Sequence, residues 1–156
     1  MESQPNGEYA LKIPSRTDNL EIIRQFVSAV ARKVGFNDEA VNKIELAVDE
    51  ACSNVIEHAY GKREDEDIGV AVRLDYGKLT VVVTDRGKSF RFNGVEMPDM
   101  KQYLAELRVG GLGIYLMKML MDEVEYHSES GRNEVRLVKY WVDRKGVRPM
   151  PSGGTP

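Results

Sequence analysis

The chain has 156 residues, of which 42% are hydrophobic, enough for the core of one domain of ordinary size. Its 22 basic and 25 acidic residues are intermixed and give a formal net charge of -3, so the basic field of a non-specific nucleic-acid-binding protein is missing. One cysteine excludes an internal disulfide and a multi-cysteine zinc site, and His58 and His127 form no HExxH pattern. Without a signal-peptide segment or an apolar run of about 20 residues, we expect a cytoplasmic protein with no membrane span.

The first predicted elements are a strand and a helix. Residues 9–13 alternate in polarity and end at a proline, which predicts an edge strand. An amphipathic helix follows, and Gly35 suits the left-handed residue that ends it. At its start, Asp18 is predicted to cap the helix, with Glu21 placed as in a capping box.

A second helix is predicted to begin at Asn37 or Asp38, since either side chain can cap, and to end near Gly61. Its apolar stripe consists of Val41, Ile44, Val48, Ala51, Cys52, Val55, Ile56 and Ala59. Glu50 and Asn54 lie away from the centre of this stripe.

The second half of the chain contains two predicted hairpins. Residues 68–74 and 79–84 form the first, with its turn at residues 75–78. Residues 88–108 are interpreted as a mobile segment that covers a site and contains a short helix at 100–107. An amphipathic helix is predicted over 112–124, and residues 124–128 and 133–142 form the second hairpin around Ser130 and Gly131.

The order of these elements is β-α-α-β-β-loop-α-β-β. Strands that come as hairpins, with the helices between them, predict an α+β two-layer sandwich. We expect a mixed, mostly antiparallel sheet with the helices on one face. Residues 1–143 are predicted to form this single domain, and the Pro- and Gly-rich residues 144–156 a disordered tail.

Glu50 and Asn54 are the first candidate site residues. Their i, i+4 spacing places a carboxylate and a carboxamide on one face of the second helix. Together they offer a proton acceptor and an oxygen ligand for a hard cation. On spacing alone, a solvated helix face is the more common explanation.

Asp85 and Gly87 follow the apolar strand at 79–84. The pattern is often only a turn, but Asp85 could also accept a hydrogen bond from an adenine amino group while Gly87 lets the backbone approach the base. The neighbouring Gly-Lys-Ser is not a Walker A loop, because that motif requires a glycine where the chain has Val82.

Gly110, Gly111 and Gly113 precede the helix predicted at 112–124. The unpaired N–H groups at a helix N-terminus suit phosphate, and glycines leave space for it. Arg108 could reach a terminal phosphate. Flexibility at the entry of the helix is an equally good explanation of the glycines alone.

In combination, these motifs resemble the ATP-binding domain of the GHKL superfamily, which includes gyrase, Hsp90, histidine kinases and MutL. Glu50-x-x-x-Asn54 matches the N box, Asp85-x-Gly87 the first glycine box and Gly111-x-Gly113 the second. Within the superfamily, the chain is most similar to the bacterial anti-sigma factor serine-protein kinases. The resemblance covers roughly residues 10–142 and rests on the sequences 45–60, 110–116, 121–124 and 131–133.

The resemblance implies a Bergerat-type, histidine-kinase-like ATPase fold that binds ATP with Mg²⁺. Asn54 would hold the metal, Glu50 would be the general base, and Asp85 would read the adenine amino group. Gly87 would line the base pocket, and Gly111 and Gly113 would contact the phosphates. The first glycine box often continues to a second glycine, where this chain has Ser89.

The function implied is an ATP-dependent protein serine kinase that is also an anti-sigma factor. Its substrate would be an anti-anti-sigma (STAS-type) protein, its second partner a sigma factor, and its assembly a homodimer. The alternative is a non-catalytic ATP-binding module that only sequesters a partner. An ATPase that drives a conformational cycle is less consistent with a chain that has no room for a transducer domain.

Overall fold

The computed structural model describes residues 7–88 and 111–141. The elements, in chain order, are β1 (Glu8–Pro14), the 3-10 turn η1 (Thr17–Asn19), α1 (Leu20–Lys33), α2 (Asp38–Asn54), the π-helical turn η2 (Val55–Ala59), β2 (Asp67–Asp75), β3 (Lys78–Asp85), α4 (Gly111–Leu120), β4 (Glu123–Glu129) and β5 (Arg132–Tyr140). The predicted order of strands and helices is confirmed for this part of the chain. The helix predicted at 100–107 and the tail at 144–156 lie outside the described residues, as does the covering segment at 88–108 apart from Lys88.

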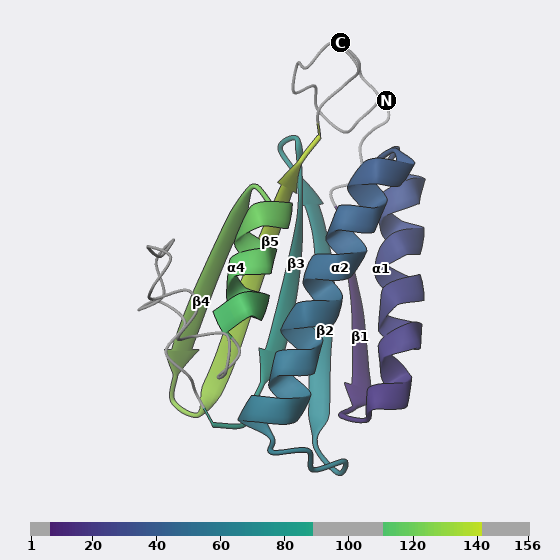
Figure 1. The fold of residues 1–156 in the computed structure, drawn as a ribbon. Helices are drawn as coiled ribbons and strands as arrows, with labels where there is room; N and C mark the ends of the chain where they lie inside the picture. The colour runs from purple at the N-terminus through teal and green to yellow at the C-terminus, as the bar shows by residue number, and fades with distance from the viewer. Residues whose placement is uncertain (1–6, 89–110, 142–156) are drawn as a thin grey trace.

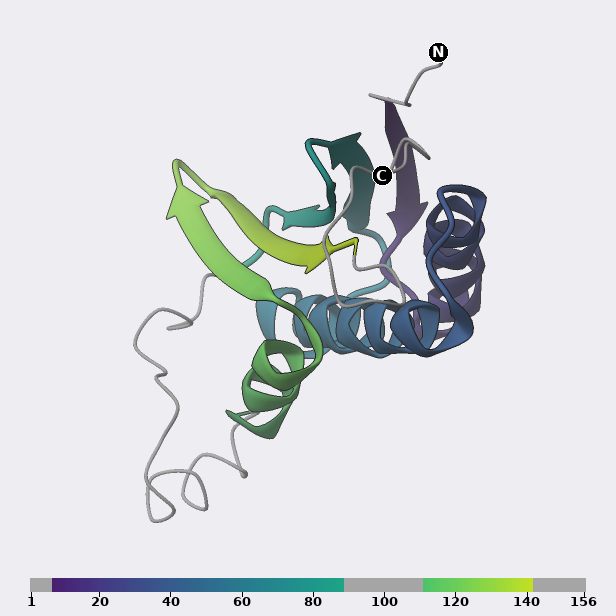
Figure 2. The same ribbon diagram turned by 90° about the horizontal axis from the view of Figure 1, so that it is seen from above.

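The five strands form one sheet in the order β1-β2-β3-β5-β4, and every strand pair within it is antiparallel. α1, α2 and α4 lie on one face of this sheet (Figures 1 and 2). The predicted two-layer α+β sandwich is therefore confirmed, with β1 at one edge as expected. Among the described residues, no helix combines the length and apolarity needed to cross a membrane.

The core lies between the helical layer and the sheet. Ile23 of α1, Val48 of α2 and Met117 of α4 are buried against alternate residues of the strands, such as Val83 and Leu137. Strands alternate sides and helices repeat every three to four residues, so both patterns bring their apolar residues to the same layer. Complete burial of each such side chain contributes about 1.5–3 kcal/mol.

The junction between α1 and α2 agrees with the prediction from the sequence. Gly35 adopts a left-handed conformation with φ of 105°, and its N–H donates to the Arg32 carbonyl at 3.0 Å. The Phe36 N–H donates to the Ala31 carbonyl at 3.2 Å, which completes a Schellman motif. Asn37 then caps α2, because its Oδ1 accepts from the Ala40 N–H at 2.8 Å.

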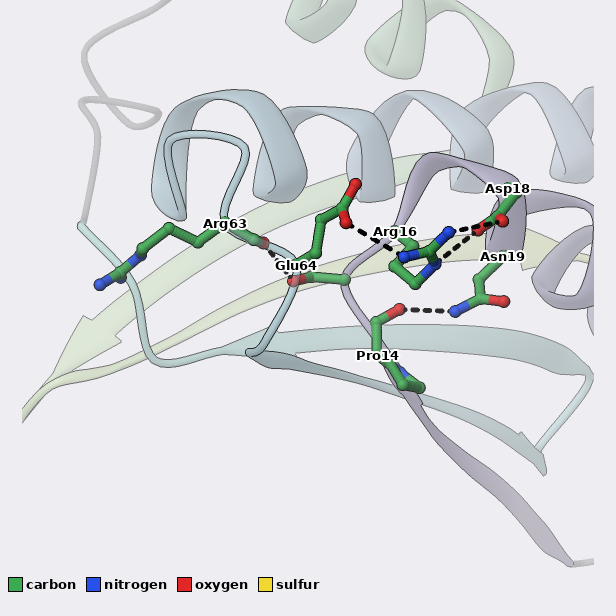
Figure 3. Close-up of polar contacts among 7 residues, drawn as sticks. Pro14, Arg16, Asp18, Asn19, Arg63 and Glu64 are labelled. Atoms are coloured by element: carbon green, nitrogen blue, oxygen red, sulfur yellow. Dashed lines mark hydrogen bonds and ion pairs between the residues drawn. The ribbon is translucent and has the colours of Figure 1, made fainter.

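The predicted capping box at the start of α1 is wrong. Asp18 lies inside η1 and accepts two hydrogen bonds from Arg16, whose guanidinium also donates to Glu64 at 3.0 Å (Figure 3). Asn19 precedes the helix without a capping side-chain bond and donates instead to the Pro14 carbonyl at 2.9 Å. The arginine competes successfully for the carboxylate, and the resulting network connects the β1–α1 junction to the loop after η2.

The predicted helix over 112–124 is too long at its C-terminal end. α4 ends at Leu120, and the Asp122 N–H donates to the Val138 carbonyl at 2.9 Å. The Asp122 carboxylate accepts from the Tyr140 N–H at 2.7 Å. Pairing with β5 therefore overrides the helical periodicity after Leu120.

Both hairpin turns are where the sequence places them. Tyr76 and Gly77 have φ of 46° and 80°, and Ser130 and Gly131 have φ of 54° and 78°. Two successive positive φ angles are those of a type I′ turn, whose twist matches that of antiparallel strands.

Candidate active site

The first part of the site is the C-terminal end of α2. Asn54 is only 7% exposed, so a solvated helix face does not describe it. The π-helical turn η2 follows immediately, and the Tyr60 N–H donates five residues back to the Val55 carbonyl at 2.9 Å. Single π turns occur frequently at functional sites. This one was not predicted, because α- and π-helical turns share nearly the same apolar pattern over five residues.

The Asn54 carboxamide is buried without a hydrogen-bond partner among residues 7–88 and 111–141. A buried polar group left without a partner costs about 1–3 kcal/mol. Its amide oxygen is a ligand type that hard cations accept. The residue therefore fits a metal or nucleotide contact better than a purely structural role.

Glu50 lies one turn earlier on α2 and is half-buried. Burial raises the pKa of its carboxyl group, and the negative charges of Asp49 and Glu57 raise that pKa further. Within the part of the chain that the structure describes, no cation or hydrogen-bond donor contacts the Glu50 carboxylate. A carboxylate with a raised pKa and no partner can accept a proton from a reacting group.

The N-terminal turn of α4 lies directly against Glu50. A Cβ atom added to Gly113 would overlap the Glu50 carboxylate oxygen and lie 3.1 Å from its Cδ. Gly111 begins the same helix, whose first N–H groups have no partner within the helix. The predicted base and the predicted phosphate-binding helix terminus are thus adjacent, while Arg108 and Gly110 lie outside the described residues.

Asp85 ends β3 and is 4% exposed. Its Oδ1 accepts from the Gly87 N–H and from Asn133 Nδ2, both at 2.8 Å. Its second oxygen has no hydrogen-bond partner among the described residues. Burial raises the pKa of Asp85, and the two donated hydrogen bonds oppose this by favouring the carboxylate.

Gly87 brings the turn after β3 against the π turn after Asn54. A Cβ atom at Gly87 would overlap the backbone of Ala59, lying 2.6 Å from its carbonyl carbon and 2.8 Å from the Tyr60 ring. The Lys88 N–H donates to the Ala59 carbonyl at 2.8 Å. Two motifs that are 31 residues apart in the sequence, Asn54 and Asp85, therefore belong to neighbouring backbone segments.

Three further residues support this site and were not assigned a role from sequence. The Tyr60 hydroxyl donates to the Asp67 carbonyl at 2.7 Å and accepts from the Arg86 N–H at 2.9 Å. Asn133 donates to Asp85, and the Ser128 hydroxyl donates to Asn133. The available signal was a polar residue, Asn133, at an inward-facing position of a strand, where an apolar residue is expected.

Two other residues considered from sequence lie apart from this chemistry. Cys52 is completely buried in the core, as predicted, and burial raises the pKa of its thiol. His58 is exposed on η2.

Comparison with known proteins decides the family. The histidine kinase-like ATPase domain matches residues 13–139. The serine-protein kinase RsbW of Bacillus pumilus is 41% identical over 128 residues, 78% of each chain, and that of Bacillus subtilis is 34% identical over 141 residues, 86% of this chain and 87% of the relative. The chain belongs to this kinase family. Membership confirms the GHKL resemblance and the predicted class of enzyme, a protein serine kinase that uses ATP.

Solved structures show the same fold. The RsbU and RsbW domains of Rv1364c from Mycobacterium tuberculosis match with a TM-score of 0.63 at 18% identity, over 87% of this chain and 33% of that longer one. The SiaB-SiaC complex from Pseudomonas aeruginosa matches with a TM-score of 0.63 at 15% identity, over 83% of this chain and 88% of that chain. At these identities the likeness concerns the fold alone.

Proposed function

We propose that this kinase transfers the γ-phosphate of ATP to a serine of an anti-anti-sigma (STAS-type) protein, and that it controls the availability of a sigma factor. The observation that carries the proposal is the contact between the Glu50 carboxylate of α2 and the N-terminus of α4 at Gly113, together with the lack of any partner for this carboxylate among the described residues. A proton acceptor beside a phosphate-binding helix terminus is the pair that phosphoryl transfer to a hydroxyl requires. The name of the relatives, serine-protein kinase, agrees with this chemistry.

Asp85 and Gly87 would bind the adenine end of ATP. The Asp85 oxygen that has no partner among the described residues would accept a hydrogen bond from the exocyclic amino group. The absence of a side chain at Gly87 lets the turn lie against η2. Gly111 and Gly113 would bind the phosphates through the backbone at the start of α4. Arg108 and Gly110 are assigned to the phosphates from their positions in the sequence just before this helix.

Asn54 would hold Mg²⁺ through its amide oxygen. The fit rests on its burial and on its lack of a partner within residues 7–88 and 111–141. Mg²⁺ in nucleotide sites takes one or two protein ligands together with phosphate oxygens. When bound, it would neutralise part of the charge on the phosphates.

Glu50 would act as the general base. Its carboxylate would accept the proton of the substrate serine hydroxyl while the serine oxygen bonds to the γ-phosphorus and the bond to the ADP oxygen breaks. The products are phosphoserine, ADP and a protonated Glu50, which returns its proton to solvent. The raised pKa of Glu50 makes it a stronger base than an exposed glutamate.

The family resemblance supports a proposal for the partners and the assembly. An anti-anti-sigma substrate, a sigma factor and a homodimer are proposed, and a protein that regulates sigma factors would act in the cytoplasm. We also propose that residues 1–143 form the functional domain and that residues 144–156 are a tail outside it.

The test is transfer of label from γ-labelled ATP to a purified anti-anti-sigma protein. We expect phosphoserine with the wild type and at least a 100-fold slower transfer with Glu50→Gln, since general base catalysis contributes about 10²–10⁴-fold. Glu39→Gln is the matched control, because Glu39 is an exposed glutamate in the first turn of the same helix. Tight ATP binding without transfer to any partner would support the non-catalytic alternative, and equal rates for Glu50→Gln and wild type would exclude Glu50 as the base.

A further inference from the structure

A row of three polar residues crosses the sheet at the adenine end of the proposed site. Ser128 of β4 is paired with Asn133 of β5, and Asn133 is paired with Asp85 of β3. Directly paired residues in antiparallel strands project to the same face of the sheet. The three side chains are therefore neighbours, although 48 residues separate Asp85 from Asn133.

The hydrogen bonds fix the orientation of the Asn133 side chain. Its Nδ2 donates to Asp85 Oδ1 at 2.8 Å and to the Gly87 carbonyl at 2.9 Å, which uses both of its N–H groups. Its Oδ1 accepts from the Ser128 hydroxyl at 2.7 Å. In the flipped orientation, the amide oxygen would face the carboxylate and carbonyl oxygens, so only the observed orientation satisfies all these groups.

The same bonds determine which Asp85 oxygen remains available. Oδ1 accepts from both Asn133 and Gly87, whereas the second oxygen accepts from no described residue. Asn133 is 2% exposed, and its carboxamide links the carboxylate to the backbone of the turn that follows it. Asp85 is thus held in one rotamer, with one oxygen occupied and the other without a partner in residues 7–88 and 111–141.

We propose that Asn133, oriented by Ser128, is a positioning residue that fixes Asp85 as a pure acceptor and thereby sets the preference of the site for a 6-aminopurine over a 6-oxopurine. The inference rests on the proposed role of Asp85 in binding adenine. A carboxylate accepts from the exocyclic amino group of adenine, but it meets only a carbonyl oxygen at the same position of hypoxanthine or guanine. A site built to receive an N–H group strongly disfavours an analogue that lacks it.

Loss of Asn133 would release this arrangement. Without the hydrogen bonds that Asn133 donates to Asp85 and to the Gly87 carbonyl, the Asp85 side chain can rotate away from the base or take up a proton. A protonated carboxyl group can donate to a 6-oxo group, so the penalty against hypoxanthine falls. A purely structural role of Asn133 would instead weaken binding of all nucleotides by the same factor.

The test compares the dissociation constants of ATP and inosine triphosphate, measured by competition with a fluorescent ATP analogue in Mg²⁺. We expect the wild type to prefer ATP about 100-fold, the order of one hydrogen bond to a charged group. Asn133→Leu should reduce this ratio at least tenfold, and Ser128→Ala about threefold. Thr80→Val is the matched control, because Thr80 is a buried polar residue of β3 on the opposite face from Asp85, and it should retain the wild-type ratio.

The outcomes separate this inference from the proposed function. If Asp85→Asn abolishes the preference but Asn133→Leu and Ser128→Ala keep it, the inference about Asn133 is overturned and the adenine contact stands. If Asn133→Leu does not fold, the ratio measured for Ser128→Ala decides, and an unchanged ratio overturns the inference. A wild type that binds both nucleotides equally would remove the adenine role of Asp85, and the inference with it.

Discussion

Substitution of Gly113 by alanine should leave the stability of this kinase nearly unchanged and strongly reduce its activity. The added Cβ atom would overlap a carboxylate oxygen of Glu50 and lie 3.1 Å and 3.3 Å from its Cδ and Cγ. All three atoms belong to the outer part of one flexible side chain, so the backbone of α4 does not have to move. Alanine is also favoured over glycine in a helix by about 0.8–1 kcal/mol. The free energy of unfolding should therefore stay within about 1 kcal/mol of the wild-type value.

The activity should respond very differently. The Glu50 carboxylate must leave its position to relieve the overlap, and a displacement of about 1 Å from the reacting group can cost about 100-fold in rate. We expect phosphotransfer to the partner serine to fall by roughly this factor. The displaced Glu50 side chain is still a carboxylate, so the loss of rate would come from its changed position and not from a changed functional group.

Urea denaturation and the initial rate of phosphoserine formation measure the two effects on the same preparations. Gly7→Ala is the control, because the nearest atom to its added Cβ is 3.8 Å away, in the Tyr9 ring, and both readouts should match the wild type. Full activity of Gly113→Ala would refute the placement of Glu50 as base. A loss of several kcal/mol in the free energy of unfolding would show that the Glu50 side chain cannot move away from residue 113.

Three other substitutions give distinct results. Gly87→Ala should lower the free energy of unfolding by about 1–3 kcal/mol in urea denaturation, because its Cβ would overlap the backbone of Ala59 rather than a flexible side chain. Asn54→Ala should make ATP affinity, measured by calorimetry with Mg²⁺ or with EDTA, nearly independent of the metal, whereas a persisting tenfold effect of Mg²⁺ would contradict Asn54 as its ligand. Glu50→Gln should raise stability at neutral pH. The raised folded-state pKa of Glu50 gives the wild type stability that is fully present below the ordinary value of 4.5 and is lost as the pH rises through the folded pKa. The stability advantage of Glu50→Gln over the wild type, followed by urea titration from pH 4 to 8, should therefore grow with pH. An advantage that shrinks with pH would contradict a raised folded-state pKa of Glu50.

The sequence by itself determined the features that depend on interactions between residues close together in the chain. Gly35 is required by a left-handed helix end, Asn37 caps the next helix through a residue three positions away, and the positive φ angles at Gly77 and Gly131 form the hairpin turns. These interactions close over a few residues, so local chemistry is sufficient to predict them. The motif residues of the nucleotide site were also recognisable, because their types and spacings carry the family resemblance.

Only the tertiary structure decided which distant groups meet. Arg16, which pairs with Asp18 in place of the predicted capping box, also binds Glu64 at 48 residues' distance in the sequence, and pairing with β5 ended α4 at Leu120. The burial of Asn54 and the π turn after it depend on packing that no local pattern encodes.

The support of Asp85 by Asn133 has the same origin. A hydrogen bond between residues far apart in sequence forms only after the strands have paired in one register, and that register depends on the whole core. Residue types could therefore be read from the chain, whereas the partner of each buried polar group was fixed by the fold.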